Sequence, residues 1–519
     1  MKNSNIIIDM YTMATRYPEK TALVDHGESS RKGISYEHIT YRQLFNDVMA
    51  TAANLRKCGF KKGDRIVVFV PMSYPLYVLC LAIAYMGAVS VFIDAWADRD
   101  RLSKACRVVS PKGFIGTRGA QVLRVNRDIR NIPVKKTVSA VVSLHNEDQG
   151  EFAPEVVSPH DEALITLTTG TTGLPKGARR THGALSEQFS VLNGHLDINE
   201  SDTDLTALPI FVFLNISTGS TSVLPLFNPA KPSSFDPAKV VEQVRELNIT
   251  TSIGSPVFYE KMADYLIGKG ETLTLKAIYT GGAPVFRPLA EKMLKAFPGT
   301  EIEIVYGCTE AEPISAISLH ESMELAAVPG MPVGKKVDGI DVKIIRASTA
   351  VIQPGEDQSI DDYLAPASEV GEIVVKGPHV LQEYLGDPEL FAKNKIKDGD
   401  DTWHRTGDAG VMDREGNIFI HGRVAKRLVN RGVNMYPVPF EQQLMEIEGV
   451  SFSSVVEKGE KVFAVIEADV SQHEKSNILT IAYEKLRRLE PDQVIFLKKI
   501  PRDPRHNSKV DYEKLSALL

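Results

Sequence analysis

The sequence predicts an α/β protein with more than one domain. Between Ile66 and Ile93, two short apolar runs flank a Leu/Ala-rich segment, as in a strand–helix–strand unit. The chain has 519 residues and 43% hydrophobic content, whereas a single core stops growing at roughly 250–300 residues. Beyond residue 423, helical and extended patterns alternate, as in an α+β module. We therefore predict a large domain over residues 1–423 and a small C-terminal domain over residues 424–519.

The expected elements follow one another along the chain. Apolar residues recur on one face of a helix that is predicted to begin near Tyr41 and to stop at Gly59. Residues 145–160 are polar and acidic, which is typical of a loop. Further helices are predicted over about 75–86, from about 100, and over about 439–448 and 476–489; C-terminal strands are predicted over 461–468 and 493–500.

The stretch from Leu164 to Thr181, LITLTTGTTGLPKGARRT, is a candidate polyanion site. An apolar strand opens into hydroxyls and glycines, which can donate hydrogen bonds to triphosphate oxygens and let the backbone approach them closely. A P-loop would require Gly at 175 and Ser or Thr at 177, but the chain has Pro175 and Gly177. A plain surface turn is the alternative. The candidate phosphate-binding residues are Thr168, Thr169, Gly170, Thr171, Thr172, Gly173 and Lys176.

Three further motifs follow in order. The segment AIYTGGAP, residues 277–284, predicts a strand that ends in a turn without side chains, where a flat base or thioester could lie against the backbone. The segment IEIVYGCTEAEP covers residues 302–313. The segment WHRTGDAG begins at Trp403, and its Asp408 stands fifteen residues before the arginine of a Gly-Arg pair.

Together, these motifs resemble the [ST][ST]G[ST]TGxPKG, YGxTE and TGD signatures of the adenylate-forming enzymes, the superfamily of acyl-CoA synthetases, peptide-synthetase adenylation domains and luciferases. The resemblance covers about Tyr41 to Lys509. It implies two mainly parallel α/β sheets, a distorted β-barrel and a small mobile C-terminal domain. It also implies that the protein is an AMP-forming acid ligase that uses ATP as substrate and Mg²⁺ as cofactor.

The resemblance implies roles for single residues. Tyr306 packs on adenine in this family, the carboxylate of Asp408 bonds the ribose hydroxyls, and Glu310 holds magnesium, which prefers carboxylate and phosphate oxygens. The implied catalytic residues are Thr309, Glu310 and Lys509; the implied metal ligands are Glu310 and Thr171; and the remaining implied nucleotide-binding residues are Gly281, Gly282, Ala283, Gly307 and Arg423.

The acid substrate is expected to lie beside the segment ALPIFVFLN. Many relatives have an aromatic residue or histidine where this chain has Val212 and Phe213, and the apolar substitution favours a lipid-like acid. The alternative is that these side chains belong to the core. We interpret the cysteine of the YGxTE-like motif as a packing residue rather than a nucleophile. The implied pocket residues are Phe211, Val212, Phe213, Gly282 and Cys308.

The acyl acceptor stays open. Coenzyme A is favoured because such enzymes are common, and Gly432 lies where the family keeps a glycine beside the pantetheine path. The segments GRVAKR and RHNSK instead resemble the β-lactone synthetases of bacterial olefin biosynthesis, in which a 3-hydroxyl closes on its own acyl-AMP. A non-catalytic ATP-binding regulator is disfavoured, because the expected catalytic and nucleotide-binding residues are present: Thr171, Lys176, Glu310, Asp408, Arg423 and Lys509.

Composition excludes other classes. The net charge of −6 shows no basic excess, so nucleic acid is not an expected partner. Four cysteines without a CxxC motif indicate free thiols in a cytoplasmic protein. The uncharged run from Ile66 to Ile93 is interrupted by Pro71 and Pro75, which argues against a transmembrane helix, although peripheral membrane contact stays open. The acid's chain length and the oligomeric state are not predicted.

Overall fold

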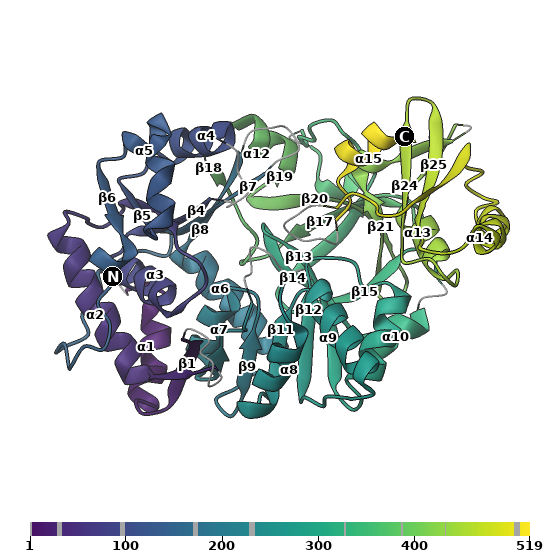
Figure 1. The fold of residues 1–519 in the computed structure, drawn as a ribbon. Coiled ribbons are helices and arrows are strands. Elements are labelled where there is room, and N and C mark those ends of the chain that lie inside the picture. Colours follow the sequence, from purple (N-terminus) through teal and green to yellow (C-terminus); the bar gives the residue numbers. More distant parts are fainter. Residues whose placement is uncertain are drawn as a thin grey trace. The chain divides into compact units, whose positions relative to one another are not determined.

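The structure is a computed structural model of the chain, shown in Figure 1. It describes residues 3–27, 34–93, 99–169, 175–227, 234–325, 328–355, 357–385, 388–430, 432–502 and 509–519. The chain forms two compact units. Unit 1 comprises Met1–Ala230, Ser234–Ile253 and Pro378–Phe391; unit 2 comprises Lys231–Ser233, Gly254–Gly377 and Ala392–Leu519.

Unit 1 contains a seven-stranded, mainly parallel sheet in the order β18-β8-β7-β4-β3-β5-β6. Strands β7, β4, β3, β5 and β6 are parallel, and β8 and β18 add antiparallel pairs at one edge. Its strands are β3 (Arg65–Phe69), β4 (Val89–Ile93), β5 (Gly113–Gly116), β6 (Val134–Thr137), β7 (Glu162–Thr169), β8 (Pro175–Thr181) and β18 (Tyr384–Leu385).

The strand–helix–strand prediction is confirmed by this sheet. Helix α3 (Tyr74–Tyr85) connects the parallel strands β3 and β4, and nearly all of its side chains are buried. A complete apolar surface of this kind is expected for a helix inside a large core rather than on its rim. The neighbouring elements are α4 (Arg99–Val109), η1 (Gly119–Val125), α5 (Arg127–Arg130) and η2 (Val138–Ala140).

A second strand run in unit 1 has the order β11-β9-β10-β1-β2, parallel except for the β1–β2 pair. The helix predicted near Tyr41 is confirmed: its N-cap Thr40 accepts a 3.1 Å hydrogen bond from the backbone N–H of Gln43. The elements are α1 (Ile7–Arg16), β1 (Thr21–His26), β2 (Tyr36–Thr40), α2 (Tyr41–Lys57), α6 (His182–His195), β9 (Thr203–Thr206), α7 (Phe211–Thr218), β10 (Thr221–Val223), α8 (Pro237–Glu246), β11 (Thr251–Gly254) and α12 (Pro388–Asn394).

Unit 2 begins with parallel strands and continues as an antiparallel run. Strand β12 pairs in parallel with β13, after which β13, β14, β15, β21, β20, β17 and β16 are neighbours in that order, all antiparallel. The elements are α9 (Pro256–Lys269), β12 (Ala277–Gly281), α10 (Arg287–Ala296), β13 (Glu301–Cys308), β14 (Ala311–Ser318), α11 (Leu319–Glu324), β15 (Met331–Lys336), β16 (Asp341–Ile345), η4 (Ile360–Tyr363), β17 (Gly371–Lys376), β19 (Lys395–Asp398), β20 (Asp401–Met412) and β21 (Ile418–Arg423).

The antiparallel run is strongly curved. Three strands separate β13 from β20 in the order, yet Tyr306 of β13 donates a hydrogen bond to Asp408 of β20. A flat sheet would hold these residues four strand spacings, or about 19 Å, apart. The curvature is what the predicted distorted barrel requires.

The C-terminal part of unit 2 is an α+β module, as predicted (Figure 1). Side chains of α13, α14 and the strands of the three-stranded sheet β24-β25-β26 form one apolar cluster. Its elements are η5 (Val424–Lys426), β22 (Leu428–Asn430), β23 (Val433–Met435), α13 (Val438–Met445), β24 (Phe452–Lys458), β25 (Lys461–Glu467), α14 (Gln472–Lys485), β26 (Gln493–Leu497) and α15 (Tyr512–Leu518).

The mixed α/β fold class is confirmed, and the domain boundary near residue 423 stays a prediction. All four cysteines are free, as expected. Within the described ranges, no helix is long and apolar enough to cross a membrane.

Candidate active site

The predicted phosphate-binding stretch includes the antiparallel strands β7 and β8 of unit 1. Strands β7 and β8 are paired up to Thr169 and Pro175. The backbones of Thr168, Thr169 and Lys176 are part of this ladder. The residues between the strands, Gly170, Thr171, Thr172 and Gly173 included, lie outside the described residues, as do the side chains of Thr168, Thr169 and Lys176. Their phosphate-binding role therefore stays a prediction.

The YGCTE motif forms the turn between β13 and β14 in unit 2. Cys308 pairs with Ala311, so Thr309 and Glu310 form a two-residue hairpin turn, and the register is irregular between Tyr306 and Cys308. A side chain at Gly307 would place its Cβ 2.8 Å from the carbonyl oxygen of Ala311, so this position admits only glycine. The irregular ladder brings the side chains of Tyr306, Cys308 and Glu310 to one end of the hairpin.

The TGD motif is a kink in β20 opposite Arg423 of β21. Thr406 Oγ1 donates to the carbonyl of Ile373 at 2.8 Å and accepts from the backbone N–H of Asp408 at 3.0 Å. Gly407 has a φ of 71°, and a Cβ there would lie 2.9 Å from Arg423 Nη2. The threonine and the glycine thus fix the backbone that carries the aspartate.

Tyr306, Asp408 and Arg423 form what we call the Asp408 cluster. The Tyr306 hydroxyl donates to Asp408 Oδ2 at 2.7 Å, and Arg423 Nη1 donates to Asp408 Oδ1 at 2.7 Å. Desolvation, then the charge of Asp408, raises the pKa of Tyr306 well above its usual value, so the phenol remains a donor. The Asp408 carboxylate raises the pKa of Arg423. The structure thus brings together three of the predicted nucleotide-binding residues.

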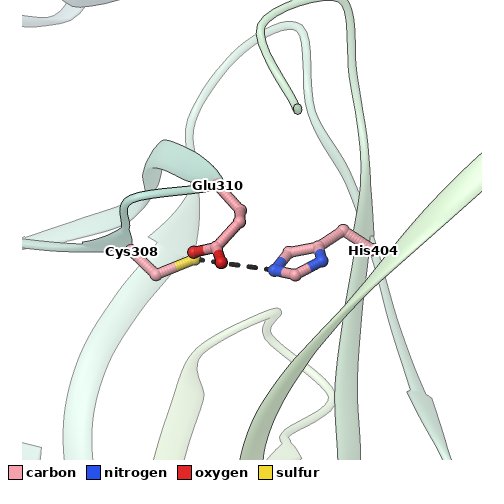
Figure 2. A group of neighbouring side chains, drawn as sticks. All are labelled: Cys308, Glu310 and His404. Carbon is pink, nitrogen blue, oxygen red and sulfur yellow. Dashed lines mark hydrogen bonds between the residues drawn. The ribbon is translucent and has the colours of Figure 1, made fainter. Parts of the chain in front are cut away.

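Cys308, Glu310 and His404 form a second group, which we call the Cys308 cluster (Figure 2). Cys308 Sγ lies 3.8 Å from His404 Nε2, and the potential ligand atoms of all three residues lie within 4.8 Å of one another. Desolvation raises the pKa of the Cys308 thiol to about 12, which agrees with its interpretation as a non-nucleophilic residue. Beside this cluster, burial lowers the pKa of Lys395 to about 7, opposed by the charge of Glu310.

His404 was not predicted from the sequence as a neighbour of Cys308. The two residues are 96 positions apart, and each belongs to a different motif of the curved antiparallel run. The only available signal was that His404 stands between the Trp and Arg of WHRTGD, on the same alternating face as Thr406 and Asp408.

The predicted glycine turns have structural explanations of their own. A Cβ at Gly281 would lie 2.3 Å from the carbonyl oxygen of Val305, whereas Gly282 has a φ of 79° and open space beside it. Ala283 follows in the same turn. Gly432, with a φ of 78°, occupies the tight turn of the β22–β23 hairpin. The hairpin alone therefore accounts for glycine at position 432.

The remaining predicted residues keep their roles as predictions. In unit 1, Phe211 and Val212 are buried, and the Phe213 ring makes an edge contact of 5.4 Å with Tyr77. Their burial also fits the core alternative. In unit 2, Lys509 is exposed and precedes Val510, whose backbone forms a bridge with Arg502.

Residues 11–385 match the AMP-binding enzyme family. The chain belongs to this family. It is 28% identical to an olefin β-lactone synthetase of Stenotrophomonas maltophilia, covering 99% of this chain and 97% of that protein. It is 27% identical to a putative acyl-CoA ligase of Bacillus subtilis, and this match covers 90% of this chain and 91% of that protein. The structure of O-succinylbenzoate coenzyme A synthetase from Bacillus subtilis, in complex with ATP and magnesium ion, superimposes with a TM-score of 0.76 at 22% identity, covering 98% of each chain.

The family match and the signature residues make this AMP-binding protein an ATP-dependent, adenylate-forming enzyme of the ligase class. ATP is accordingly one of its small-molecule substrates.

Proposed function

We propose that the enzyme activates a fatty acid by transferring AMP from ATP to its carboxylate, with release of pyrophosphate. The carboxylate oxygen attacks the α-phosphorus, the bond from that phosphorus to the bridging oxygen breaks, and the acyl-AMP remains bound. The observation that carries this proposal is the Asp408 cluster. Its aspartate is positioned by Tyr306 and Arg423 through two 2.7 Å hydrogen bonds.

The Asp408 carboxylate can accept more hydrogen bonds than it makes within the chain. Each of its oxygens accepts one bond, whereas an ionised carboxylate offers about four lone-pair sites. Two ribose hydroxyls can therefore donate to it without displacing Tyr306 or Arg423. The side chain is 13% exposed, which shields these bonds from competing water.

Glu310 fits the magnesium ion that the family implies. Its carboxylate is a hard oxygen ligand at a hairpin turn, whereas its neighbours Cys308 and His404 offer sulfur and nitrogen, which Mg²⁺ does not prefer. When bound, Mg²⁺ neutralises charge on the phosphates. Glu310 would hold it, with Thr171 as the second proposed protein ligand.

Lys509 is proposed to contact the developing charge at the α-phosphate and the acyl oxygen. Lys509→Ala is expected to slow acyl-AMP formation by roughly 10²–10³-fold, because it removes a preorganised cation from that charge. ATP binding should survive. Adenylate formation is measured by ATP–pyrophosphate exchange, and exposed Lys104, far along the chain in α4, provides the control Lys104→Ala. A normal exchange rate in Lys509→Ala would reassign the catalytic lysine.

For the second step, we propose closure of a 3-hydroxyacyl-AMP to a β-lactone. The 3-hydroxyl oxygen attacks the acyl carbon, AMP leaves, and the hydroxyl proton is released. The proposal is supported by the similarity to an olefin β-lactone synthetase over almost the whole length of both chains. An internal hydroxyl needs no second substrate site, and tethering can supply an effective molarity of ~10⁵ M or more.

Transfer to coenzyme A is the second candidate, supported by the similarity to the putative acyl-CoA ligase. The structure weakens one argument for it, because the β22–β23 turn requires glycine at position 432 irrespective of any pantetheine.

A panel of acids with MgATP, with and without coenzyme A, tests both steps. We expect a long-chain 3-hydroxy acid without coenzyme A to turn over repeatedly and to give AMP and a second product. The mass of this product should be about 18 units below that of the hydroxy acid, which corresponds to the loss of one water. The unsubstituted acid should stop at bound acyl-AMP. A thioester that forms only with coenzyme A, without the lighter product, would contradict lactone closure. The absence of pyrophosphate exchange with every acid would contradict adenylation itself.

A further inference from the structure

We propose that Cys308, Glu310 and His404 form a binding site for a borderline-soft divalent cation such as Zn²⁺, and that this ion competes with Mg²⁺ for Glu310. The existence of the site rests on geometry and ligand chemistry. Its effect on catalysis rests on the proposed function of Glu310.

The three side chains have the spacing that such an ion requires. Zinc binds sulfur at about 2.3 Å and nitrogen or oxygen at about 2.0–2.2 Å, so two ligand atoms of a tetrahedral site are about 3.3–3.6 Å apart. Cys308 Sγ and His404 Nε2 are already 3.8 Å apart, and all three ligand atoms lie within 4.8 Å of one another (Figure 2). Rotamer adjustments of about 1 Å are sufficient to close the site.

The backbone and a neighbouring carbonyl orient the ligands. Cys308 and Glu310 are separated by one residue of a tight hairpin turn, and His404 lies in the middle of β20. His404 Nδ1 lies 3.2 Å from the carbonyl oxygen of Asn394, which fixes that nitrogen as the donor and leaves the Nε2 lone pair directed at Cys308. Zinc-binding histidines typically have this second hydrogen bond.

The donor set discriminates between the two metals. Thiolate and imidazole favour Zn²⁺, whereas Mg²⁺ takes oxygen ligands, so only the Glu310 carboxylate suits both ions. When Zn²⁺ binds, the Cys308 thiol transfers its proton to solvent and a sulfur–metal bond forms, with no change in oxidation state. Three protein ligands leave a fourth position for water. Zinc on Glu310 therefore removes a ligand of the catalytic magnesium.

Cobalt(II) tests the site directly, because a tetrahedral cobalt–thiolate bond gives a near-ultraviolet charge-transfer band and intense visible bands. The full-length protein, stripped of metals and free of nucleotide, is titrated with Co²⁺. We expect these bands to saturate at one equivalent and to disappear when Zn²⁺ is added. Cys308→Ser and His404→Gln should each weaken binding by about 100-fold or more. The matched control, Cys58→Ser, removes a free thiol on the other unit and should leave the titration unchanged.

Circular dichroism confirms that each variant is folded, and the two ligand variants give independent readings. The proposal is overturned if the unmodified protein shows no thiolate band at one equivalent, or if the band survives in both Cys308→Ser and His404→Gln.

Pyrophosphate exchange at limiting Mg²⁺ tests the competition, with each protein compared with its own zinc-free rate. Zinc should inhibit the unmodified enzyme and Cys58→Ser, extra Mg²⁺ should relieve this inhibition, and Cys308→Ser should resist it by at least about tenfold in zinc concentration. Cobalt binding without zinc inhibition would contradict the competition with Mg²⁺ for Glu310, but it would not contradict the existence of the cation site. Absence of exchange in the zinc-free enzyme would instead contradict the proposed function and leave the cobalt result unaffected.

Discussion

The β13–β14 hairpin and the neighbouring strands β20 and β21 carry two side-chain clusters that differ in how the chain arranges their charges. In the Asp408 cluster, a carboxylate is held by a phenol and a guanidinium at 2.7 Å each. In the Cys308 cluster, a thiol lies 3.8 Å from an imidazole, with a carboxylate beside them. The first is preorganised by strong hydrogen bonds within the chain. The second consists of metal-ligand types at metal-ligand spacing. Neighbouring strands of one antiparallel run thus hold a cluster that we propose binds ribose and a cluster that we propose binds a cation.

Both clusters need β20 to keep its position. Arg405, which lies between His404 and Asp408 in the sequence, anchors this strand. Arg405 follows His404 and points to the opposite face of the strand. Its guanidinium donates to the buried Glu372 carboxylate at 2.6 Å and to the carbonyl of Ala350 at 2.7 Å, and both ion-pair side chains are at most 6% exposed. This buried pair joins β20 to β17 and to the segment after β16.

The largest expected effect is therefore on stability. Arg405→Leu leaves Glu372 buried without its cation, which costs about 3–5 kcal/mol. Burial already raises the pKa of Glu372, and this loss raises it further. The folded variant then retains a proton that the unfolded chain releases above about pH 4.3, so its stability falls as pH rises. Urea denaturation at about pH 5 and about pH 8 measures this. Exposed Arg414, in the turn before β21, gives the control Arg414→Leu. If the two variants lose equal free energy of unfolding, Arg405 does not anchor β20.

The next effect separates the two clusters. Asp408→Asn replaces an oxygen acceptor with an amide nitrogen that cannot accept from Tyr306 or a ribose hydroxyl. We expect kcat/KM for ATP to fall by about 10²-fold, because buried groups are left unsatisfied. Cobalt binding at Cys308 should be unchanged, because Asp408 is not one of its ligands. If the affinity for cobalt falls as much as kcat/KM for ATP does, the two clusters act as one unit, and the distinction between them is wrong.

Glu310→Gln distinguishes the two metals. The amide is a weaker ligand than a carboxylate for either cation, so the Mg²⁺ concentration for half-maximal pyrophosphate exchange should rise by roughly tenfold. Cobalt affinity should also fall, but the thiolate band should persist at higher Co²⁺, since sulfur and imidazole remain. Exposed Glu301, at the start of the same strand, provides the control Glu301→Gln. If the magnesium dependence is unchanged in Glu310→Gln, Glu310 is not a magnesium ligand.

Motifs that act over a few residues could be predicted from the sequence, and so could the ligand that three of their residues share. The direct side-chain contacts that curvature creates across the antiparallel run could not be predicted. Tyr306, Asp408 and Arg423 were expected to share a ligand, and the structure places them in direct contact. The approach of His404 to Cys308 depends on sheet curvature, which periodicity does not encode.

The C-terminal module shows the same limit locally. Helix α14 begins four residues before its predicted start, at a Ser471–Glu474 capping box that the sequence did contain. Strand β24 was not predicted, because its buried residues include Ser453 and Ser454, and Ser453 Oγ donates to the carbonyl of Glu441. Buried serines interrupt the apolar alternation by which strands are recognised.

The smallest expected effect concerns Lys395, which pairs with His404 across β19 and β20 and interacts electrostatically with Glu310 and Cys308. An ammonium group beside a cation site repels the incoming ion, and at an effective dielectric constant near 20 even a partly populated charge is worth about 1 kcal/mol. Lys395→Met retains the length and apolar stem of this buried side chain without the charge. We expect cobalt to bind about three- to tenfold more tightly to Lys395→Met. Exposed Lys397→Met, two residues along the same strand, should change cobalt affinity less. Weaker cobalt binding in Lys395→Met would mean that Lys395 positions His404 rather than repels the metal, and the cation site would then depend on the β19–β20 pair as well as on its three ligands.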